Sequence, residues 1–443
     1  MRVRNYIYTA VFALLAIGCE DQLEIEPAQS ISGDLAITSE ENIENILIGV
    51  YDESGQSPSY GGRLQIMADL LGSGNATVWS GTFADPRQIK TKGILADNAF
   101  VGAFWNNAYE VINQANLVID NVSIITSDEL KKNRIEGEAR FLRAFTYFDL
   151  IRHFASGTNG VPLRTEGILD YSVDLSIGRT ATSSVIDLII GDLEAAVTLL
   201  PESNEFFADK FAAEALLARV YLDQGLYAAA RDAANDVIEN SGHALASSFA
   251  AAFNNDSDGP EDIFAYQVTS QTGTNQLITF YADEGNGGRG GDISITDDYV
   301  ALFDDPADER ANFFYASGQS GERLTAKYTN QFGNIPVLRL AEMYLIRAEA
   351  NVREGTTVGA TPINDLNALR SRSGAGLLGG EILLEDVLNE RLLELAFEGF
   401  SVHDIKRTES SVDGFNFDAP ELVFPIPQSE IDTNPMMEQN PGY

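Results

Sequence analysis

One stretch of the chain, residues 211–240, constrains the fold more than any other. Its small, aromatic and glycine residues follow a fixed spacing, at Ala218, Tyr221, Gly225, Tyr227 and Ala230. A small residue such as Ala218 lets two helices approach closely, Tyr221 fills the gap one turn later, and Gly225 can end the first helix. The spacing therefore predicts two helices packed against each other and joined by a tight turn.

This spacing is typical of tetratricopeptide repeats, and a weaker copy follows the same rule. Ala348 and Gly355 are separated like Ala218 and Gly225, so we expect helix pairs at 211–240 and 339–373. Apolar residues at helical spacing predict further helices at 40–51, 104–120, 127–153 and 183–200. Strand-like runs are short, at 263–268, 277–281 and 335–338. The sequence thus predicts a mainly α fold of tetratricopeptide-like helix pairs, interrupted by loop-rich insertions at 56–98 and 241–334.

Charge and cysteine content exclude several classes of function. The formal net charge of the 443 residues is −37, and so acidic a surface repels phosphate backbones, which argues against nucleic acid as a partner. The single cysteine, Cys19, excludes a disulfide framework and a cysteine-ligated zinc site within one chain. The three histidines, His153, His243 and His403, are far apart in sequence, so no metal site is predicted.

No motif in the sequence predicts a cofactor or catalysis. Gly285–Gly290 fits G-x-G-x-x-G, but no helical pattern follows it at once, so a surface loop is favoured over a dinucleotide site. The acidic loop that begins at Asn254 has Ala265 where a calcium loop carries its bidentate glutamate, so an incidental loop is favoured over a calcium site. We found no nucleophile elbow, no Walker loop and no marked pair of carboxylates. The protein is therefore predicted not to be an enzyme.

The N-terminus predicts a lipid anchor. Arg2 and Arg4 precede an apolar run, Ile7–Ile17, which has the length of a signal-peptide core and is too short to cross a bilayer. Small residues then lead to Cys19. We interpret residues 1–18 as a lipoprotein signal peptide cleaved before a lipidated Cys19, and residues 19–39 as an acidic leader. A plain secretory signal with an incidental cysteine is the alternative.

Charged residues also recur along two predicted helices near the C-terminus. They stand three to five positions apart, at Arg339, Glu342, Arg347, Glu349, Glu390, Arg391, Glu394 and Glu398. Opposite charges at this spacing pair on helices, and ion pairing within and between helices is therefore preferred over a functional site.

Taken in order along the chain, several of these segments resemble the SusD/RagB family of outer-membrane lipoproteins of Bacteroidetes. The segments that carry the resemblance are Cys19 with Glu20–Pro27, then Trp105–Asn116, Glu138–Ala144, Pro336–Ala350, Leu366–Arg372, Glu390–Gly399 and the ending Ile426–Tyr443. The resemblance implies one SusD-like domain over residues 40–443. It also implies a non-catalytic lipoprotein that is exposed on the outer membrane. Such a protein captures glycan and passes it to a SusC-like TonB-dependent transporter.

The sequence constrains the identity of the ligand less than it constrains the family. Strong acidity disfavours anionic polymers, so an oligosaccharide or polysaccharide without charge, such as a neutral glucan, is the preferred ligand. Peptide capture, as in some RagB-type proteins, is the alternative within the family, and a surface glycosidase is the alternative outside it.

Two glycine-rich loops carry the residue types that a surface sugar site needs. An aromatic ring stacks on a sugar face, and amide, carboxylate and guanidinium groups bond to hydroxyls. The first loop, Tyr60–Arg87, offers Trp79, Asp69, Asn75 and Arg87, and the second, Tyr281–Asp292, offers Tyr281, Asn286 and Arg289. We expect the two loops to converge into one ligand-binding site. Trp79 has a second interpretation, as an anchor that holds its loop to the scaffold.

Overall fold

The computed structural model describes residues 37–273 and 275–443, and Cys19 with the predicted signal peptide lies outside them. The predicted mainly α fold is confirmed, since helices dominate the described chain. The longer helices are α3 (Glu40–Ser54), α4 (Arg63–Gly72), α6 (Ala99–Asn121), α7 (Glu129–Phe154), α8 (Thr182–Leu199), α9 (Lys210–Asp223), α10 (Tyr227–Asn240), α13 (Leu340–Glu354), α14 (Pro362–Arg372) and α15 (Leu384–Glu394). The shorter ones are α5 (Ala84–Lys90), α11 (Gln276–Tyr281), α12 (Asp297–Val300), α16 (Ser401–Arg407) and α17 (Gln428–Thr433).

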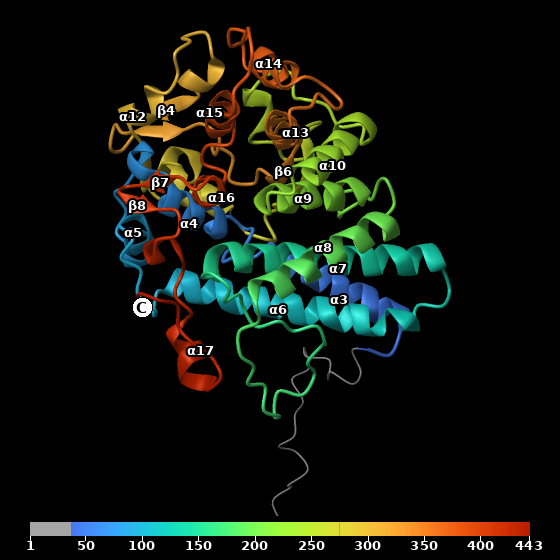
Figure 1. The fold of residues 1–443 in the computed structure, drawn as a ribbon. Helices are drawn as coiled ribbons and strands as arrows, with labels where there is room; N and C mark the ends of the chain where they lie inside the picture. Colours follow the sequence, from blue (N-terminus) through green and yellow to red (C-terminus); the bar gives the residue numbers. More distant parts are fainter. Residues whose placement is uncertain (1–36, 274) are drawn as a thin grey trace, which may run out of the picture.

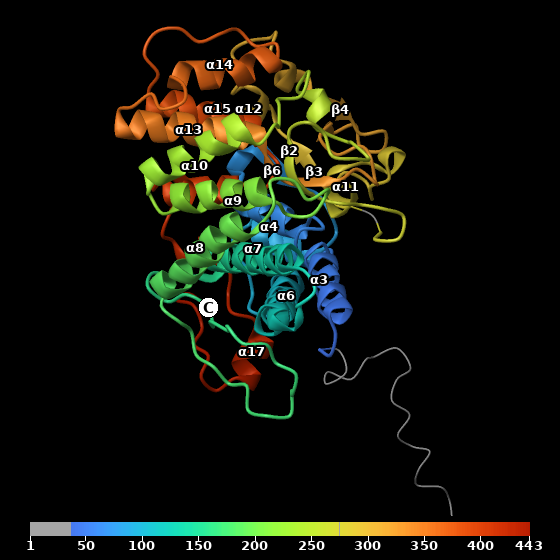
Figure 2. The ribbon, with the colours of Figure 1, turned by 90° about the vertical axis from the view of Figure 1, so that its right-hand side faces the viewer.

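The long helices stack in layers. Figure 1 shows α3, α6 and α7 side by side with α8 in the lower half, and α9, α10, α13 and α14 above them. The stretch 211–240 forms α9 and α10, and the stretch 339–373 contains α13 and α14. In Figure 2 the stacked helices α8, α9, α10 and α13 occupy one side, while α11 and the strands β2, β3 and β4 occupy the other. The molecule therefore has a helical half and a half built largely from loops.

Local sequence signals explain where the longest helices begin. Asp128 caps α7, because its side chain accepts hydrogen bonds from the backbone N–H groups of Leu130 and Lys131. The predicted start at 127–129 is thus correct. Asn98 caps α6 in the same way, and Gly355 ends α13 in the left-handed conformation that glycine adopts without strain.

The strands form four two-stranded antiparallel sheets within the described residues. Their members are β1 (Thr77–Trp79) with β3 (Ile293–Ile295), β2 (Asp262–Tyr266) with β6 (Ile335–Arg339), β4 (Phe314–Ala316) with β5 (Arg323–Thr325), and β7 (Ser411–Val412) with β8 (Phe415–Asn416). The predicted strands at 263–268 and 335–338 correspond to β2 and β6. The predicted strand at 277–281 is wrong, because this run forms helix α11, which Asn275 caps by accepting from the N–H of Leu277. A short apolar run fits a buried helix as well as a strand.

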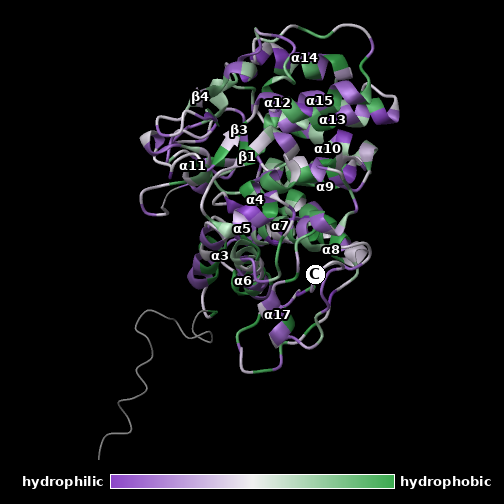
Figure 3. Ribbon diagram, turned by 90° about the vertical axis from the view of Figure 1, so that its left-hand side faces the viewer, coloured by the Kyte–Doolittle hydropathy of each residue, from purple (hydrophilic) through white to green (hydrophobic). Residues whose placement is uncertain are grey.

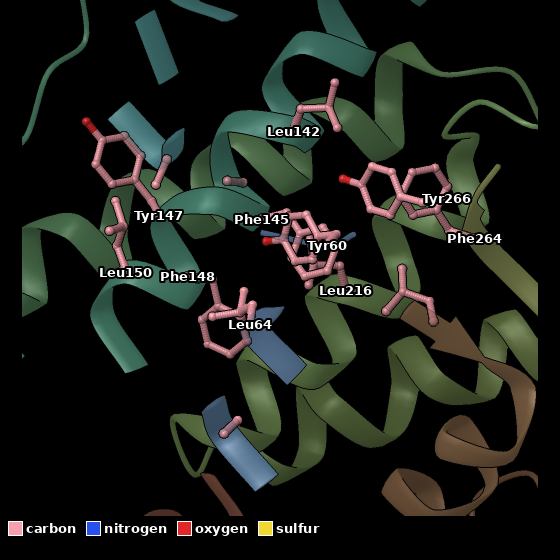
Figure 4. Packing of buried hydrophobic residues seen from close by; sticks show 14 of the residues in the cluster. Tyr60, Leu64, Leu142, Phe145, Tyr147, Phe148, Leu150, Leu216, Phe264 and Tyr266 are labelled. Atoms are coloured by element: carbon pink, nitrogen blue, oxygen red, sulfur yellow. The ribbon is translucent and has the colours of Figure 1, made fainter. Parts of the chain in front are cut away.

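The largest core cluster extends from α3 through α6–α10 and reaches beneath the loops to β2 and α11, and a second, smaller cluster lies between α13, α14 and α15. Figure 4 shows Tyr60 among side chains of α7, with Tyr266 and Phe264 of β2 beside them. The Tyr60 ring stacks on Phe145 at 4.3 Å and on Tyr266 at 5.2 Å between ring centroids. Figure 3 shows hydrophilic and hydrophobic residues mixed along single helices such as α13, as expected when one face is buried.

The charged residues of α13 and α15 pair in the interior, as the sequence predicts. Glu394 lies at the centre of this ion-pair cluster: its carboxylate pairs with Arg310, Arg339 and Arg372. Arg339 also pairs with Glu261 at 2.6 Å and with Glu398 at 2.8 Å. The cluster therefore ties α14 and α15 to β6 and to the short 3-10 helix Glu309–Asn312, which carries Arg310.

Among the described helices we found none that is both long enough and apolar enough to span a membrane.

Candidate functional site

The two glycine-rich loops converge, as predicted. Strand β1 of the first loop pairs with β3, which directly follows the second, in the register Thr77 with Ile295 and Trp79 with Ile293. Beyond the strands, Arg289 Nη2 donates to Thr82 Oγ1 at 3.0 Å, and its guanidinium lies 4.0 Å from the centre of the Phe83 ring. Phe83 remains 43% exposed. Together, Thr82, Phe83 and Arg289 form an exposed surface, which we call the Phe83 surface.

Three of the predicted binding residues lie in the interior instead. Trp79 is 9% exposed and packs against Phe280, with the ring centroids 5.9 Å apart. Tyr281 and Asp69 are fully buried, and the Tyr281 hydroxyl donates to an Asp69 carboxylate oxygen at 3.0 Å. The expectation that Trp79 and Tyr281 present exposed rings is therefore wrong. A loop residue can point inward when its strand is paired, and sequence alone did not reveal the pairing of β1 with β3.

The remaining predicted residues lie at or near the surface. Asn75 and Arg87 are exposed, and Asn286 and Arg289 are partly exposed. Arg87 donates to the carbonyl of Gly81, and Asn286 donates to an Asp283 carboxylate oxygen. Arg289 also pairs with Asp292 at 2.9 Å. Arg87, Asn286 and Arg289 thus hold the loops in shape, and their predicted contacts with a ligand stay a prediction.

Burial changes the acidity of Asp69. It raises the pKa of this carboxyl group from 3.8 to about 7, against the hydrogen bonds from the Gly399 N–H and the Tyr281 hydroxyl. Because the folded chain keeps the proton that the unfolded chain releases above pH 3.8, this group lowers the stability as the pH rises.

We therefore expect Asp69→Asn to remove one component of the pH dependence of stability. Between roughly pH 4 and pH 7 the free energy of unfolding of the wild type should fall relative to that of the variant by about 1.4 kcal/mol per pH unit. Urea unfolding of both proteins at several pH values measures this difference. A constant difference across the range would show that Asp69 is ionised in the folded protein.

A groove that the sequence did not reveal lies on the loop-rich side. It has a volume of about 430 Å³ and runs between the end of α3, strand β2 and the segments around 206 and 272. The residues that line it include Ile48, Tyr51, Asp52, Gln56, Ser57, Phe206, Phe207, Tyr266, Gln267, Thr272, Asn275 and Gln276. We call it the Phe206 groove.

Phe206 gives this groove an aromatic face. The residue is 47% exposed, and its ring rests on Phe207, with centroids 4.4 Å apart. Phe207 in turn packs on Tyr51 at 4.9 Å, whose hydroxyl accepts from the N–H of Ala208. A ring that is exposed on one side and supported on the other is suited to stack on a flat apolar face.

Amide side chains line part of the groove, beside apolar residues such as Ile48, Val268 and Ile335. Gln267 is fixed by hydrogen bonds to Asp258 at 2.8 Å and from Asn334 at 2.8 Å, and Gln56 donates to the backbone and carboxylate of Asp52. Asp52 is the one charged side chain among the described residues that line the groove. A groove that combines apolar side chains with amides and hydroxyls and has few charges is suited to bind a neutral ligand that carries both apolar faces and hydroxyl groups.

The turn before α4 contains Gly61, which lines the Phe206 groove, and this turn packs closely against α11. Gly62 has φ +122°, and a Cβ there would lie 2.7 Å from the backbone N of Leu277, so the position requires glycine. The pair Gly61-Gly62 and the aromatic pair Phe206-Phe207 in a polar loop were the two signals in the sequence that could have pointed to this groove.

Two family models match separate parts of the chain. The model described as "Starch-binding associating with outer membrane" matches residues 21–222, and the model of the SusD family matches residues 315–419. The chain belongs to the SusD/RagB family.

Relatives and solved structures agree with this assignment over most of the chain. SusD-like protein P2 of Formosa agariphila is 28% identical over 511 aligned positions, which cover 100% of both chains. The starch-binding protein SusD of Bacteroides thetaiotaomicron is 26% identical over 203 positions, covering 42% of this chain and 36% of that protein. A crystal structure of a SusD superfamily protein from Bacteroides thetaiotaomicron matches with a TM-score of 0.82 at 26% identity, covering 91% of this chain and 100% of that one.

Proposed function

We propose that this protein is a non-catalytic glycan-binding lipoprotein of the outer membrane, and that the Phe206 groove holds the glycan. The observation that carries the proposal is the combination of an exposed, supported aromatic ring with amide groups in one groove of about 430 Å³. The family model for residues 21–222 describes starch binding, and the SusD relative is named for it.

The groove also supports a preference among glycans. We found no lysine or arginine among the described residues that line it, and Asp52 adds a negative charge. With a net charge of −37 on the whole chain, an anionic polymer would meet repulsion at long range and no cation at contact. We therefore propose a neutral glucan as the ligand.

The remaining parts of the proposal concern where the protein acts. We propose that Cys19 carries the lipid, that the folded body lies at the cell surface, and that a SusC-like TonB-dependent transporter receives the glycan. The likeness to outer-membrane-associated proteins supports this arrangement.

A binding panel tests the function. Purified protein should bind neutral α- or β-glucan oligosaccharides in isothermal titration calorimetry and leave their length unchanged on overnight incubation. Binding of alginate or of peptides in place of neutral glucans would overturn the ligand class, and shortened oligosaccharides would reveal a glycosidase.

Substitution of two exposed phenylalanines, Phe206 and Phe83, tests where the glycan binds. We expect Phe206→Ala to weaken glucan binding about 5- to 150-fold, by analogy with the roughly 1–3 kcal/mol of aromatic stacking on bases, with little change in melting temperature. Phe83→Ala is the matched control, because Phe83 is exposed to a similar extent on the other surface. The opposite pattern, with affinity lost only in Phe83→Ala, would place the glycan on the Phe83 surface beside Arg289.

A further inference from the structure

Two of the three histidines meet inside the protein. His153 lies in the last turn of α7 and His403 lies in α16, far along the chain, yet their ring centroids are 4.7 Å apart. Both side chains are buried, and so is Asp149, which lies one turn before His153 on α7. The spacing of the histidines in the sequence does not predict a metal site, because the two rings come from helices that only the tertiary fold brings together.

Each of the two histidines has one buried ring nitrogen without a hydrogen-bond partner among the described residues. His153 Nδ1 lies 2.8 Å from the carbonyl oxygen of Asp149, so Nδ1 carries the proton and Nε2 keeps a free lone pair. His153 Nε2 and His403 Nδ1 are both buried with no hydrogen-bond partner among the described residues. A histidine that donates one N–H to a backbone carbonyl and leaves its other nitrogen free is oriented as metal-binding histidines are.

A small cavity lies against the same three side chains. Its volume is about 40 Å³, and Asp149, His153 and His403 all line it, together with Gln65, whose amide atoms also lack partners. A space of this size accommodates an ion with a bound water. The cavity therefore lies against the side chains that carry the two nitrogens without partners.

We propose that Asp149, His153 and His403 form a binding site for a divalent cation of the zinc class. One ligand atom from each residue lies within 4.8 Å of the others. Ligands of a tetrahedral zinc ion, each about 2.1 Å from the metal, stand about 3.4 Å apart, so small side-chain rotations close the site. Two imidazoles and one carboxylate are a ligand set that zinc and its transition-metal neighbours take in proteins, and the cavity leaves room for a fourth ligand.

The charges around the site are compatible with a cation. Asp149 accepts from the Tyr60 hydroxyl at 2.6 Å on one oxygen and from Arg152 on the other, and each oxygen keeps a further lone pair. Arg219, which pairs with Glu342 at 2.6 Å, lines the same cavity. Two more cationic side chains lie near the histidines, Arg152 and Lys406, and Lys406 donates to the backbone oxygen of Arg152. Asp223 interacts electrostatically with both of them and offsets their charge together with Asp149.

Metal binding to untagged protein tests the proposal directly. After treatment with EDTA and dialysis, the protein should take up one equivalent of Zn²⁺, measured by mass spectrometry of the bound metal. Its melting temperature should rise by about 3 °C at a hundredfold excess of Zn²⁺ over the dissociation constant. Zinc X-ray absorption on the wild type should show two imidazole ligands. No uptake of Zn²⁺, or a spectrum without imidazole ligands, would overturn the proposal.

The third histidine supplies a matched control. His153→Phe and His403→Phe should each lower zinc affinity at least tenfold, whereas His243→Phe should leave it unchanged, because His243 is not part of the cluster. If His243→Phe alone reduces zinc uptake, the site lies elsewhere and the proposal fails. Should the phenylalanine variants not fold, the absorption spectrum of the wild type still decides the outcome.

Discussion

Replacing Glu394 by glutamine should destabilise the protein by about 3–5 kcal/mol. The Glu394 carboxylate is fully buried and pairs with Arg310, Arg339 and Arg372, so the neutral amide leaves three buried guanidinium groups with less negative charge. Arg339 and Arg310 keep other acidic partners, but Arg372 retains only Glu261, at 3.7 Å. Urea unfolding of the variant and the wild type measures the loss.

Glu129→Gln is the control for this substitution. Glu129 also pairs with a cation, Lys132 at 3.4 Å, but its side chain is 72% exposed, so its removal should cost less than about 1 kcal/mol. Equal losses in the two variants would show that the interior cluster contributes no more than a surface ion pair.

The same cluster sets the response to acid. Burial raises the pKa of Glu394, but Arg372, Arg339 and Arg310 outweigh it and hold the pKa well below its usual value of 4.5; the pKa of Glu398 is lowered as well. Such carboxylates stabilise the fold above pH 4.5, and this contribution declines as the pH falls toward their folded pKa. The variant should therefore lose less stability than the wild type on acidification below pH 4.5.

Trp79→Ala should also destabilise the protein, by about 3–5 kcal/mol, while leaving the glucan affinity of the folded protein unchanged. The ring packs against Phe280, and a Cβ at Gly81 would come within 2.5 Å of it, so the indole fills its space closely. Alanine leaves a cavity at the junction of β1 and β3. Thermal or urea unfolding, paired with calorimetric titration of glucan, separates the two effects.

Trp79→Phe is a milder substitution that tests the same packing. The indole Nε1 is buried with no hydrogen-bond partner among the described residues, so phenylalanine keeps part of the packing and loses no hydrogen bond. We expect it to cost less than half of the alanine effect. If Trp79→Phe instead lowers the glucan affinity at unchanged stability, Trp79 contacts the glycan, as the composition of its loop suggests.

The sequence by itself determined the class of fold and the family. Helical periodicity along single segments depends on local spacing, and caps such as Asp128 depend on one side chain and the next turn, so both can be read from neighbouring residues. The charged residues of α13 and α15 were correctly predicted to form ion pairs, because charges at helical spacing are costly to bury alone.

Tertiary structure alone decided which side of each loop faces the solvent. Trp79 looked like a surface residue because its neighbours include glycine, serine and asparagine, and Tyr281 did because it begins a glycine-rich loop. Pairing of β1 with β3 turned Trp79 inward, and Asp69 bound the Tyr281 hydroxyl in the interior. The Phe206 groove and the pair of His153 and His403 likewise depend on segments distant in the chain. Such contacts arise from the packing of whole elements. The pairs Gly61-Gly62 and Phe206-Phe207 mark two of the segments that line the groove, but no local pattern shows that the fold brings them together.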